Sequence, residues 1–372
     1  MYEQIREDTL YIMLYAVVTA TALIASCYLL FRRANAIAPD VTSPVRLRRW
    51  TAAFFAVFVV NHLWYMLPLF FLTSNEDIKL TNLLGGLLDS ITFFPLAIIV
   101  MLTMLQDRQR PLWPAWAMVM PVVVGMVWCV ISQSDALLPI LIVYLLLMII
   151  GLTIYMVHAL RQYGRWLRDN YADLEHKEVW QSFVVLAVML LVFGSYMLSD
   201  SAPAYEYALQ LVVVLLVGYL LWRVETLSDL SIFQQQDLPA DLDNSDKDES
   251  NVSQNDLTDN IELLLQKYCI DTQLYLQHDL TLPQLAKAIG TNRYYLSQYY
   301  SSKEMNYNTY INDLRINHFV SLYREAVATH RSFTIQELAN DSGYRSYSTF
   351  NLAFKQRMGQ TVNAWAKLQN LQ

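Results

Sequence analysis

The sequence predicts an all-α protein: a seven-transmembrane helical bundle in residues 1–223, followed by a cytoplasmic domain with two helix–turn–helix units. Three observations predict this fold. The chain of 372 residues is 55% hydrophobic and has a mean hydropathy of +0.26, which is too apolar for an ordinary soluble protein. Runs of about 20 apolar residues, the length that a bilayer requires of a helix, occur about seven times, all before residue 224. Two similar patterns of helix caps, apolar positions and glycine follow near the C-terminus.

The apolar runs give the expected transmembrane helices directly. They are approximately Thr9–Phe31, Trp50–Leu72, Leu83–Leu105, Leu112–Ile131, Ala136–Leu160, Val179–Leu198 and Tyr205–Trp222. Pro114 and Pro121 interrupt the fourth run, which a bundle tolerates because neighbouring helices satisfy the freed backbone groups. The first run is too long for a signal peptide and has acidic residues before it, so we expect it to remain as a helix.

Basic residues predict the orientation of this bundle. Eleven of them lie in the connections after the first, third and fifth spans, whereas only Arg6 and Lys79 lie on the other side. The positive-inside rule therefore predicts an outer N-terminus and a cytoplasmic C-terminus. The connections on the outer side are too short to form a folded sensor domain.

Charge divides the rest of the chain into a linker, residues 224–260, and a C-terminal domain, residues 261–372. The linker has one basic and ten acidic residues, and its stretch DLPADLDNSDKDESNVSQNDLTDN contains no aromatic residue, which predicts a disordered acidic tether. Its beginning, Val224–Phe233, has apolar residues at about helical spacing. This spacing predicts that the seventh helix continues into the cytoplasm, either as an amphipathic helix on the membrane surface or as a short dimerising coil.

The stretch TLPQLAKAIGTNRYYLSQYY, residues 281–300, predicts a helix, a sharp turn and a second helix. Thr281 is a typical N-cap residue, and Gly290 permits the turn. Helical spacing places the apolar residues of the second helix on one face and hydrogen-bonding side chains on the opposite face. The side chains of the polar face and its edge are Arg293, Tyr294, Ser297 and Gln298. Such side chains suit base edges and phosphates in a major groove, although an ordinary helical hairpin has the same pattern.

A second copy of the pattern follows a long helix expected at about Asn308–Ala328. Thr334 is the cap and Gly343 the turn, and Phe350, Ala353 and Phe354 then face inward. The outward residues are Tyr347, Ser348, Asn351, Leu352 and Lys355. A leucine on a polar face suits contact with a thymine methyl group. The repetition favours a DNA-reading domain over a chance hairpin.

Residues of about 261–368 resemble the DNA-binding domain of AraC/XylS-type regulators. The resemblance lies in LTLPQLAKAIGTNRYYLS, in YINDLRINHF with Tyr310 and Arg315, and in TIQELANDSGYRSYSTFNLAFKQRMGQT. It implies that both second helices enter successive major grooves of double-stranded DNA, with six outward residues at the positions that usually meet bases. These six are Tyr294, Ser297, Gln298, Ser348, Asn351 and Leu352.

The sequence departs from the family pattern at three places. Tyr344 stands where the family usually has phenylalanine, Val362 where it has proline, and Met305 with Asn306 where it often has glycine. The missing proline concerns only the start of the final helix. The domain has 11 basic and 8 acidic residues, a net charge of +3, so its attraction to phosphates is weak. We therefore expect binding to need both units, and two chains as a homodimer.

The membrane part contains no pattern typical of a catalytic, metal or cofactor site. Cys27, Cys129 and Cys269 have no metal-ligand spacing and are expected to be free thiols. His62 and Asp89 are ionisable residues at comparable depth in adjacent spans, which is costly and marks a candidate site for a small or lipophilic signal. A histidine that is merely hydrogen-bonded within the bundle is the alternative for His62.

Together these observations predict a membrane-integral transcription regulator rather than an enzyme, with no cofactor. A DNA reader on a membrane anchor implies a bacterial inner membrane, since no nuclear envelope then separates the two. The expected partners are double-stranded DNA, the lipid bilayer, a second copy of the chain, the unknown signal and, as a further candidate, RNA polymerase. Two alternatives remain: a transporter or membrane enzyme whose tail binds proteins, and an anchor that senses nothing.

Overall fold

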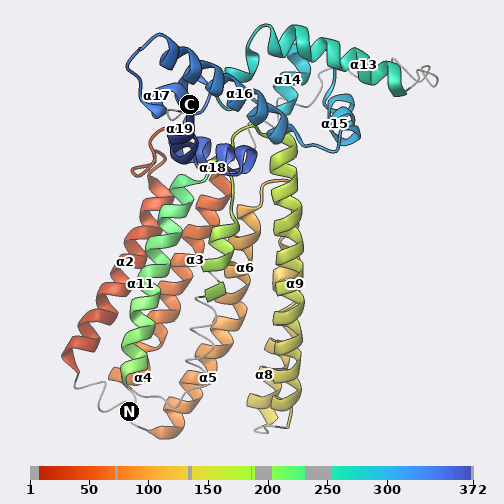
Figure 1. The fold of residues 1–372 in the computed structure, drawn as a ribbon. Coiled ribbons are helices and arrows are strands. Elements are labelled where there is room, and N and C mark those ends of the chain that lie inside the picture. Colours follow the sequence, from red (N-terminus) through yellow and green to blue (C-terminus); the bar gives the residue numbers. More distant parts are fainter. Residues whose placement is uncertain are drawn as a thin grey trace. The chain divides into compact units, whose positions relative to one another are not determined.

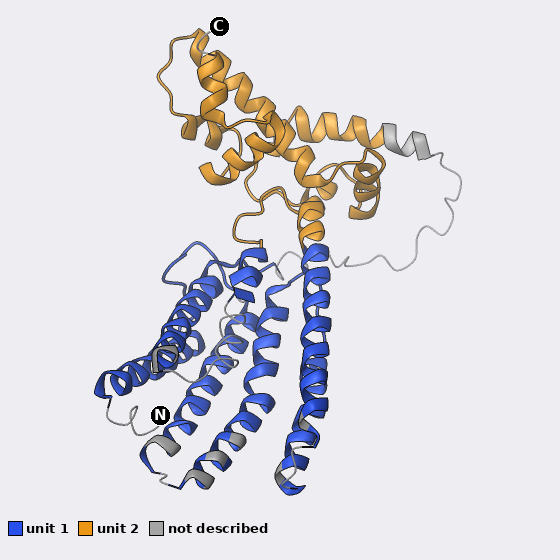
Figure 2. Cartoon of the chain, turned by 60° about the horizontal axis from the view of Figure 1, so that its bottom comes forward, with its two compact units in different colours: residues 1–163, 179–234 blue, residues 164–178, 235–372 orange. Residues whose placement is uncertain are grey.

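The computed structural model describes residues 8–71, 74–132, 136–185, 187–188, 203–230 and 254–369. The described residues form helices and no strands, which confirms the all-α fold class. The chain divides into two compact units (Figure 2). Unit 1 contains residues 1–163 and 179–234, and unit 2 contains residues 164–178 and 235–372.

Unit 1 consists of long apolar helices and shorter helical pieces (Figure 1). They are α2 (Thr9–Phe31), α3 (Val45–Trp64), α4 (Met66–Phe70), α5 (Asn75–Ile91), α6 (Phe93–Met104), α7 (Trp113–Ala117), α8 (Met120–Ser132), α9 (Leu138–Asn170, which ends in unit 2) and α11 (Pro203–Thr226). Helix α2 packs against α3 and α11, and α3 also packs against α6. Asp8 caps α2, because its carboxylate accepts from the backbone N–H groups of Leu10 and Tyr11, both at 3.1 Å.

Prolines divide three of the expected spans. Helices α3, α5 and α7 end at Trp64, Ile91 and Ala117, each four residues before a proline of the following helix. These prolines are Pro68, Pro95 and Pro121. A proline ring clashes with the carbonyl group four residues earlier and has no N–H to donate, so each helix is interrupted at that point.

Among the described residues, four helical stretches are long and apolar enough to cross a membrane: Thr9–Phe31, Leu80–Met104, Pro139–Asn170 and Glu206–Thr226. Their outer faces expose large apolar side chains, such as Ile24, 68% exposed, and Ile154, 66% exposed, as a lipid-facing helix does. The number of seven spans stays a prediction, and most of the sixth expected span, Val179–Leu198, lies outside the described residues.

Helix α11 ends at Thr226, earlier than the continuation through Phe233 that the apolar spacing predicts. Leu227 and Leu230 have no exposed surface and are part of the packing of unit 1. The backbone N–H of Leu230 donates to the side-chain oxygen of Gln106 at 2.9 Å. Leu227 and Leu230 therefore pack within unit 1 without continuing the helix. Residues 231–253 lie outside the described residues.

Unit 2 contains the helices of the C-terminal domain (Figure 1). They are α13 (Gln254–Leu265), a π-helical turn (Gln266–Ile270), a 3-10 turn (Leu274–Leu276), α14 (Leu282–Ala288), α15 (Arg293–Ser302), α16 (Tyr307–Ala328), α17 (Ile335–Asp341), α18 (Tyr347–Met358) and α19 (Val362–Gln369). Because α13 begins at Gln254, the last seven residues of the expected tether, 254–260, are helical.

Two hydrophobic cores lie within unit 2, and the long helix α16 contributes to both. Ile311 belongs to the first core, together with buried side chains of α14 and α15. Phe319 belongs to the second core, together with buried side chains of α17, α18 and α19. Of the positions expected to face inward on the second helices, Leu296 and Phe350 have no exposed surface, and Tyr299 and Ala353 are buried. Each helix–turn–helix pair therefore has its own core, and α16 joins the two.

Candidate DNA-binding surface

The first helix–turn–helix pair consists of α14 and α15. Thr281 and Gln284 form a capping box at the start of α14, as the sequence predicts for the cap residue. Gly290 has a φ of +76° in the turn, a conformation that glycine adopts without steric cost. Asn292 then caps α15 by accepting from the backbone N–H of Tyr295 at 3.0 Å. Local capping and one glycine thus fix the start of α15.

The second pair, α17 and α18, repeats this design. Thr334 and Glu337 form a capping box, and Gly343 has a φ of +87°. Ser346 caps α18 by accepting from the backbone N–H of Thr349 at 3.3 Å. The repetition that the sequence predicts is therefore present at the level of individual hydrogen bonds.

Helices α15 and α18 present the predicted contact residues on their surface. On α15, Arg293, Tyr294, Ser297 and Gln298 are exposed. On α18, Ser348, Leu352 and Lys355 are exposed, whereas Tyr347 and Asn351 are half-buried. Tyr294 and Leu352 are large side chains that remain mostly exposed, with 68% and 58% of their surface accessible. These nine side chains remain the predicted DNA contacts.

The side chain of Arg315, in α16, links the two helix–turn–helix pairs. It is 1% exposed and donates from Nε to the carbonyl oxygen of Tyr275 at 2.7 Å and from Nη2 to that of Gln277 at 2.8 Å. Its guanidinium also lies 5.5 Å from the centre of the Tyr344 ring. A buried guanidinium is stable only with such partners, so α16, the segment before α14 and the turn of the second pair are joined at one point.

Gly343 allows a close approach between the same two parts of unit 2. A Cβ at this position would lie 2.8 Å from the Cα and carbonyl oxygen of Leu276, so no larger residue fits without movement. The carbonyl oxygen of Gly343 also lies 3.1 Å from Nδ1 of His278. The turn of the second pair is thereby packed directly against the segment that leads into the first pair.

The departures from the family pattern have local explanations. Tyr344 is buried, and its hydroxyl group lies 3.5 Å from the carbonyl oxygen of Asn312, so the extra oxygen has an acceptor. The hydroxyl of Thr361 accepts from the backbone N–H of Ala364 at 3.4 Å, and α19 begins at Val362 without the proline. Asn306 caps α16 by accepting from the backbone N–H of Thr309 at 2.9 Å.

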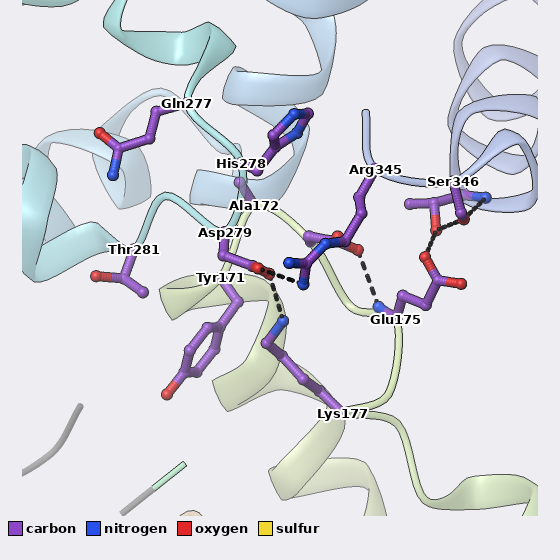
Figure 3. Close-up of polar contacts among 12 residues, drawn as sticks. Tyr171, Ala172, Glu175, Lys177, Gln277, His278, Asp279, Thr281, Arg345 and Ser346 are labelled. Atoms are coloured by element: carbon purple, nitrogen blue, oxygen red, sulfur yellow. Dashed lines mark hydrogen bonds and ion pairs between the residues drawn. The ribbon is translucent and has the colours of Figure 1, made fainter. Parts of the chain in front are cut away.

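The sequence places residues 171–178 in a connection between two spans, but the structure includes them in unit 2. Figure 3 shows their polar contacts, in which Asp279 bonds both Lys177 and Arg345, each at 3.1 Å. Burial raises the pKa of Asp279, but these two cations outweigh it and hold the pKa below its ordinary value. The pair with Lys177 therefore persists at neutral pH. No motif marks these residues in the sequence, because their partners lie about a hundred residues away.

Unit 1 places His62 and Asp89 in two different hydrogen-bond networks. Asp89 accepts from the Asn61 side chain at 2.6 Å and from the Tyr65 hydroxyl at 2.7 Å. The His62 ring lies flat on the Tyr15 ring, with centroids 3.5 Å apart. Its Nδ1 lies 2.6 Å from the hydroxyl oxygen of a threonine in α2, Thr19.

No direct hydrogen bond joins His62 to Asp89 in the described part of the chain. The two networks meet in α3, where Asn61 and His62 are consecutive residues. Consecutive helical side chains point about 100° apart, so one residue bonds toward α5 and the next toward α2. Both side chains are thus partnered by protein groups, and their role in sensing stays a prediction.

Comparison with known proteins identifies the C-terminal helices. Residues 285–368, from α14 to α19, match a family described as a helix-turn-helix domain. Neither the curated proteins nor the solved structures contained a match to the chain. The match covers both pairs and α16 between them, which are the elements that carry the exposed contact residues. The C-terminal part of this chain is therefore an AraC-type helix–turn–helix domain, and it follows a helical N-terminal region.

Proposed function

We propose that this protein is a membrane-integral bacterial transcription regulator that binds specific double-stranded DNA through α15 and α18. The observation that carries the proposal is the pair of exposed polar helix faces, each on a separately capped helix of an AraC-type domain. The matching family is regulatory rather than enzymatic, and it implies binding to DNA. Side chains with hydrogen-bonding groups on such a helix read base edges in a major groove.

The two helices divide the work of recognition in this proposal. Gln298 and Asn351 carry amides, which pair with two atoms of adenine at once, and Leu352 suits a thymine methyl group. Arg293 and Lys355 supply positive charge for the phosphates beside them. The domain has a net charge of only +3, so attraction to the phosphate backbone contributes little, and sequence-specific contacts of both helices with successive major grooves become necessary.

A second chain would increase the affinity for DNA. Two membrane-bound copies raise each other's local concentration, so a homodimer holds DNA at a level that a single weakly basic domain does not reach. The apolar faces of unit 1 support placement in the inner membrane, with the C-terminal domain in the cytoplasm. The networks around His62 and Asp89 are the proposed place where a small or lipophilic signal acts, because they are polar groups within an apolar bundle.

Selection from random DNA tests this function in the intact protein. The full chain, held in lipid nanodiscs, is incubated with a library of random duplexes, and the bound fraction is sequenced over several rounds. We expect one enriched motif with two elements about one helical turn apart. A variant with Gln298→Ala and Asn351→Ala is expected to lose the base preference at those elements.

The control is Gln336→Ala, which removes an exposed glutamine from α17 rather than from a reading helix. It is expected to select the same motif as the wild type. A well-folded full chain that enriches no motif at low salt would contradict the proposal and favour a tail that binds proteins.

A further inference from the structure

Residues 171–178, the stretch YADLEHKE, directly follow α9 and form an integral part of unit 2. They connect two expected membrane spans, and the matched helix–turn–helix family does not include them, since the match begins at residue 285. Figure 3 shows that they contact residues from both halves of the DNA-binding domain. These contacts are independent of the residues that read DNA.

Backbone bonds join the 171–178 segment to the first helix–turn–helix pair. Tyr171 and Thr281, the cap of α14, form an isolated antiparallel β-bridge, and the N–H of Ala172 donates to the carbonyl oxygen of Leu280 at 3.2 Å. Ala172 is 1% exposed and belongs to the same hydrophobic core as α14 and α15. The Asn308 side chain donates to the carbonyl oxygens of Tyr171 and Ala172, at 3.1 and 2.7 Å.

Side-chain bonds join the same segment to the second pair. Glu175 accepts from the hydroxyl of Thr349, a residue of α18, at 3.1 Å. Lys177 pairs with Asp279, which in turn pairs with Arg345 in the turn before α18. The Lys177 side chain is only 6% exposed, unlike an ordinary surface ion pair. The Asp279 side chain is 34% exposed, so the pair is half-buried, and loss of Asp279 would leave the shielded Lys177 charge without its carboxylate partner.

The 171–178 segment leaves the reading faces uncovered. Ser348 precedes Thr349 on α18 and is exposed, as is Leu352 one turn further along. On α15, Tyr294 and Ser297 are also exposed. The segment contacts both helix–turn–helix pairs and leaves their outer faces exposed. This geometry suits an element that positions the pairs relative to each other, not one that blocks the DNA-binding surface.

We propose that the 171–178 segment is a positioning element of the DNA-binding domain, which fixes the distance and angle between α15 and α18 and so sets the spacing of the two DNA elements. Glu175 and Lys177 are its positioning residues, and they touch no DNA. This inference rests on the proposed function, because spacing has a meaning only if both helices read one duplex.

Docking of the segment is tested first, without DNA. A water-soluble carbodiimide activates a carboxylate and joins it to a nearby amine with loss of water. In the full chain in nanodiscs we expect a cross-link between Lys177 and Asp279. The exposed pair Lys303–Glu262, at the same 3.1 Å, is the internal control for reagent activity. A cross-link of the control pair without one at Lys177 would overturn the proposal.

Spacing is tested second, on the motif selected from random DNA. Inserting one base pair between its two elements moves the second element by about 3.4 Å and turns it by roughly 35°. The wild type is expected to lose affinity several-fold on this insertion. A variant with Glu175→Ala and Lys177→Ala is expected to show a smaller difference in affinity between the two spacings than the wild type, because only the contacts of Arg315 and Gly343 then join the two pairs.

Two controls separate positioning from a general loss of stability. The conservative variant Glu175→Gln with Lys177→Arg keeps an acceptor and a cation, and it is expected to restore the wild-type spacing preference. Lys303→Ala breaks an ion pair of the same length elsewhere in unit 2 and is expected to leave that preference unchanged.

Two results of the spacing test would overturn the proposal. One is an alanine variant that keeps the wild-type preference for spacing, because positioning would then not depend on Glu175 and Lys177. The other is a variant that binds DNA more tightly at every spacing, because the segment would then compete with DNA. If the Lys177–Asp279 cross-link forms but no DNA motif is selected, the proposed function is wrong, and the spacing role is wrong with it. If the cross-link does not form, it is the docking of the segment that is wrong.

Discussion

Asn351 is the residue at which base reading is most directly testable. Its side chain is half-buried on the face of α18 that is predicted to meet DNA, and an amide forms two hydrogen bonds with adenine but not with the other bases. Asn351→Ala is therefore expected to weaken binding to the selected motif by roughly 1–3 kcal/mol and to relax the preference at one base pair. Competition binding against single-base variants of the motif measures both effects. A uniform loss at all variants would indicate a phosphate contact instead.

Cys269 provides a second prediction at the residue scale. It has no exposed surface, and burial raises the pKa of its thiol to about 11. The thiolate is the reactive form, so at pH 7 to 8 both access and ionisation are unfavourable. We expect Cys269 to resist a maleimide in the native protein and to react fully in denaturant, as followed by mass spectrometry of the peptide. Rapid labelling of the native protein at pH 7 would show that the first core of unit 2 opens.

At the scale of elements, the two turn glycines form a matched pair. Gly290 and Gly343 both have positive φ, so alanine costs about 1–2 kcal/mol at either position. A Cβ at Gly290 meets nothing within 4 Å, whereas at Gly343 it lies 2.8 Å from the backbone of Leu276. Gly343→Ala is therefore expected to reduce the free energy of unfolding of unit 2 by roughly 1–3 kcal/mol more than Gly290→Ala. Hydrogen exchange of the unit 2 amides measures the difference, and equal losses would show that the turn adjusts.

The helices of the two helix–turn–helix pairs could be predicted because their signals are local, whereas the start of α13 falls in the stretch predicted to be a disordered tether. Thr334 and Glu337 are three residues apart, and their capping box needs nothing from the rest of the chain. The inward positions, such as Phe350, follow from helical spacing alone. The helix break before Pro95 could also be predicted from the sequence, because a proline always clashes with the carbonyl group four residues earlier.

The contacts of the 171–178 segment had no such signal. Glu175 bonds Thr349 across 174 positions of the chain, and neither residue type is unusual where it stands. For the same reason the sequence pairs His62 with Asp89 only by their depth in the expected spans. In the structure His62 contacts Thr19, and Asp89 accepts a hydrogen bond from Asn61. Depth in an expected helix constrains one coordinate, and side-chain direction around the helix decides the partner.

At the scale of the whole molecule, the orientation of the chain is the decisive expectation. Basic residues favour one side by 11 to 2, so a reporter fused after Glu76 is expected outside the cytoplasm and one fused after Asp107 inside. A fusion at the C-terminus is expected inside as well. Alkaline phosphatase and a fluorescent protein, active on opposite sides, report the two locations. A C-terminus outside the cytoplasm would exclude DNA binding by the intact protein.

The bonds of Arg315 also determine which sequence changes this fold tolerates. Its guanidinium donates to the backbone carbonyl oxygens of Tyr275 and Gln277, and Gln277 itself has an exposed side chain. A hydrogen bond to the backbone does not depend on which side chain residue 277 carries. It does depend on the position of that carbonyl group, which an insertion would shift. In a library of variants, most substitutions at Gln277 are therefore expected to be neutral, whereas inserting a single residue between Leu276 and Gln277 is expected to abolish function. Over evolutionary time this loop can drift in composition but not in length.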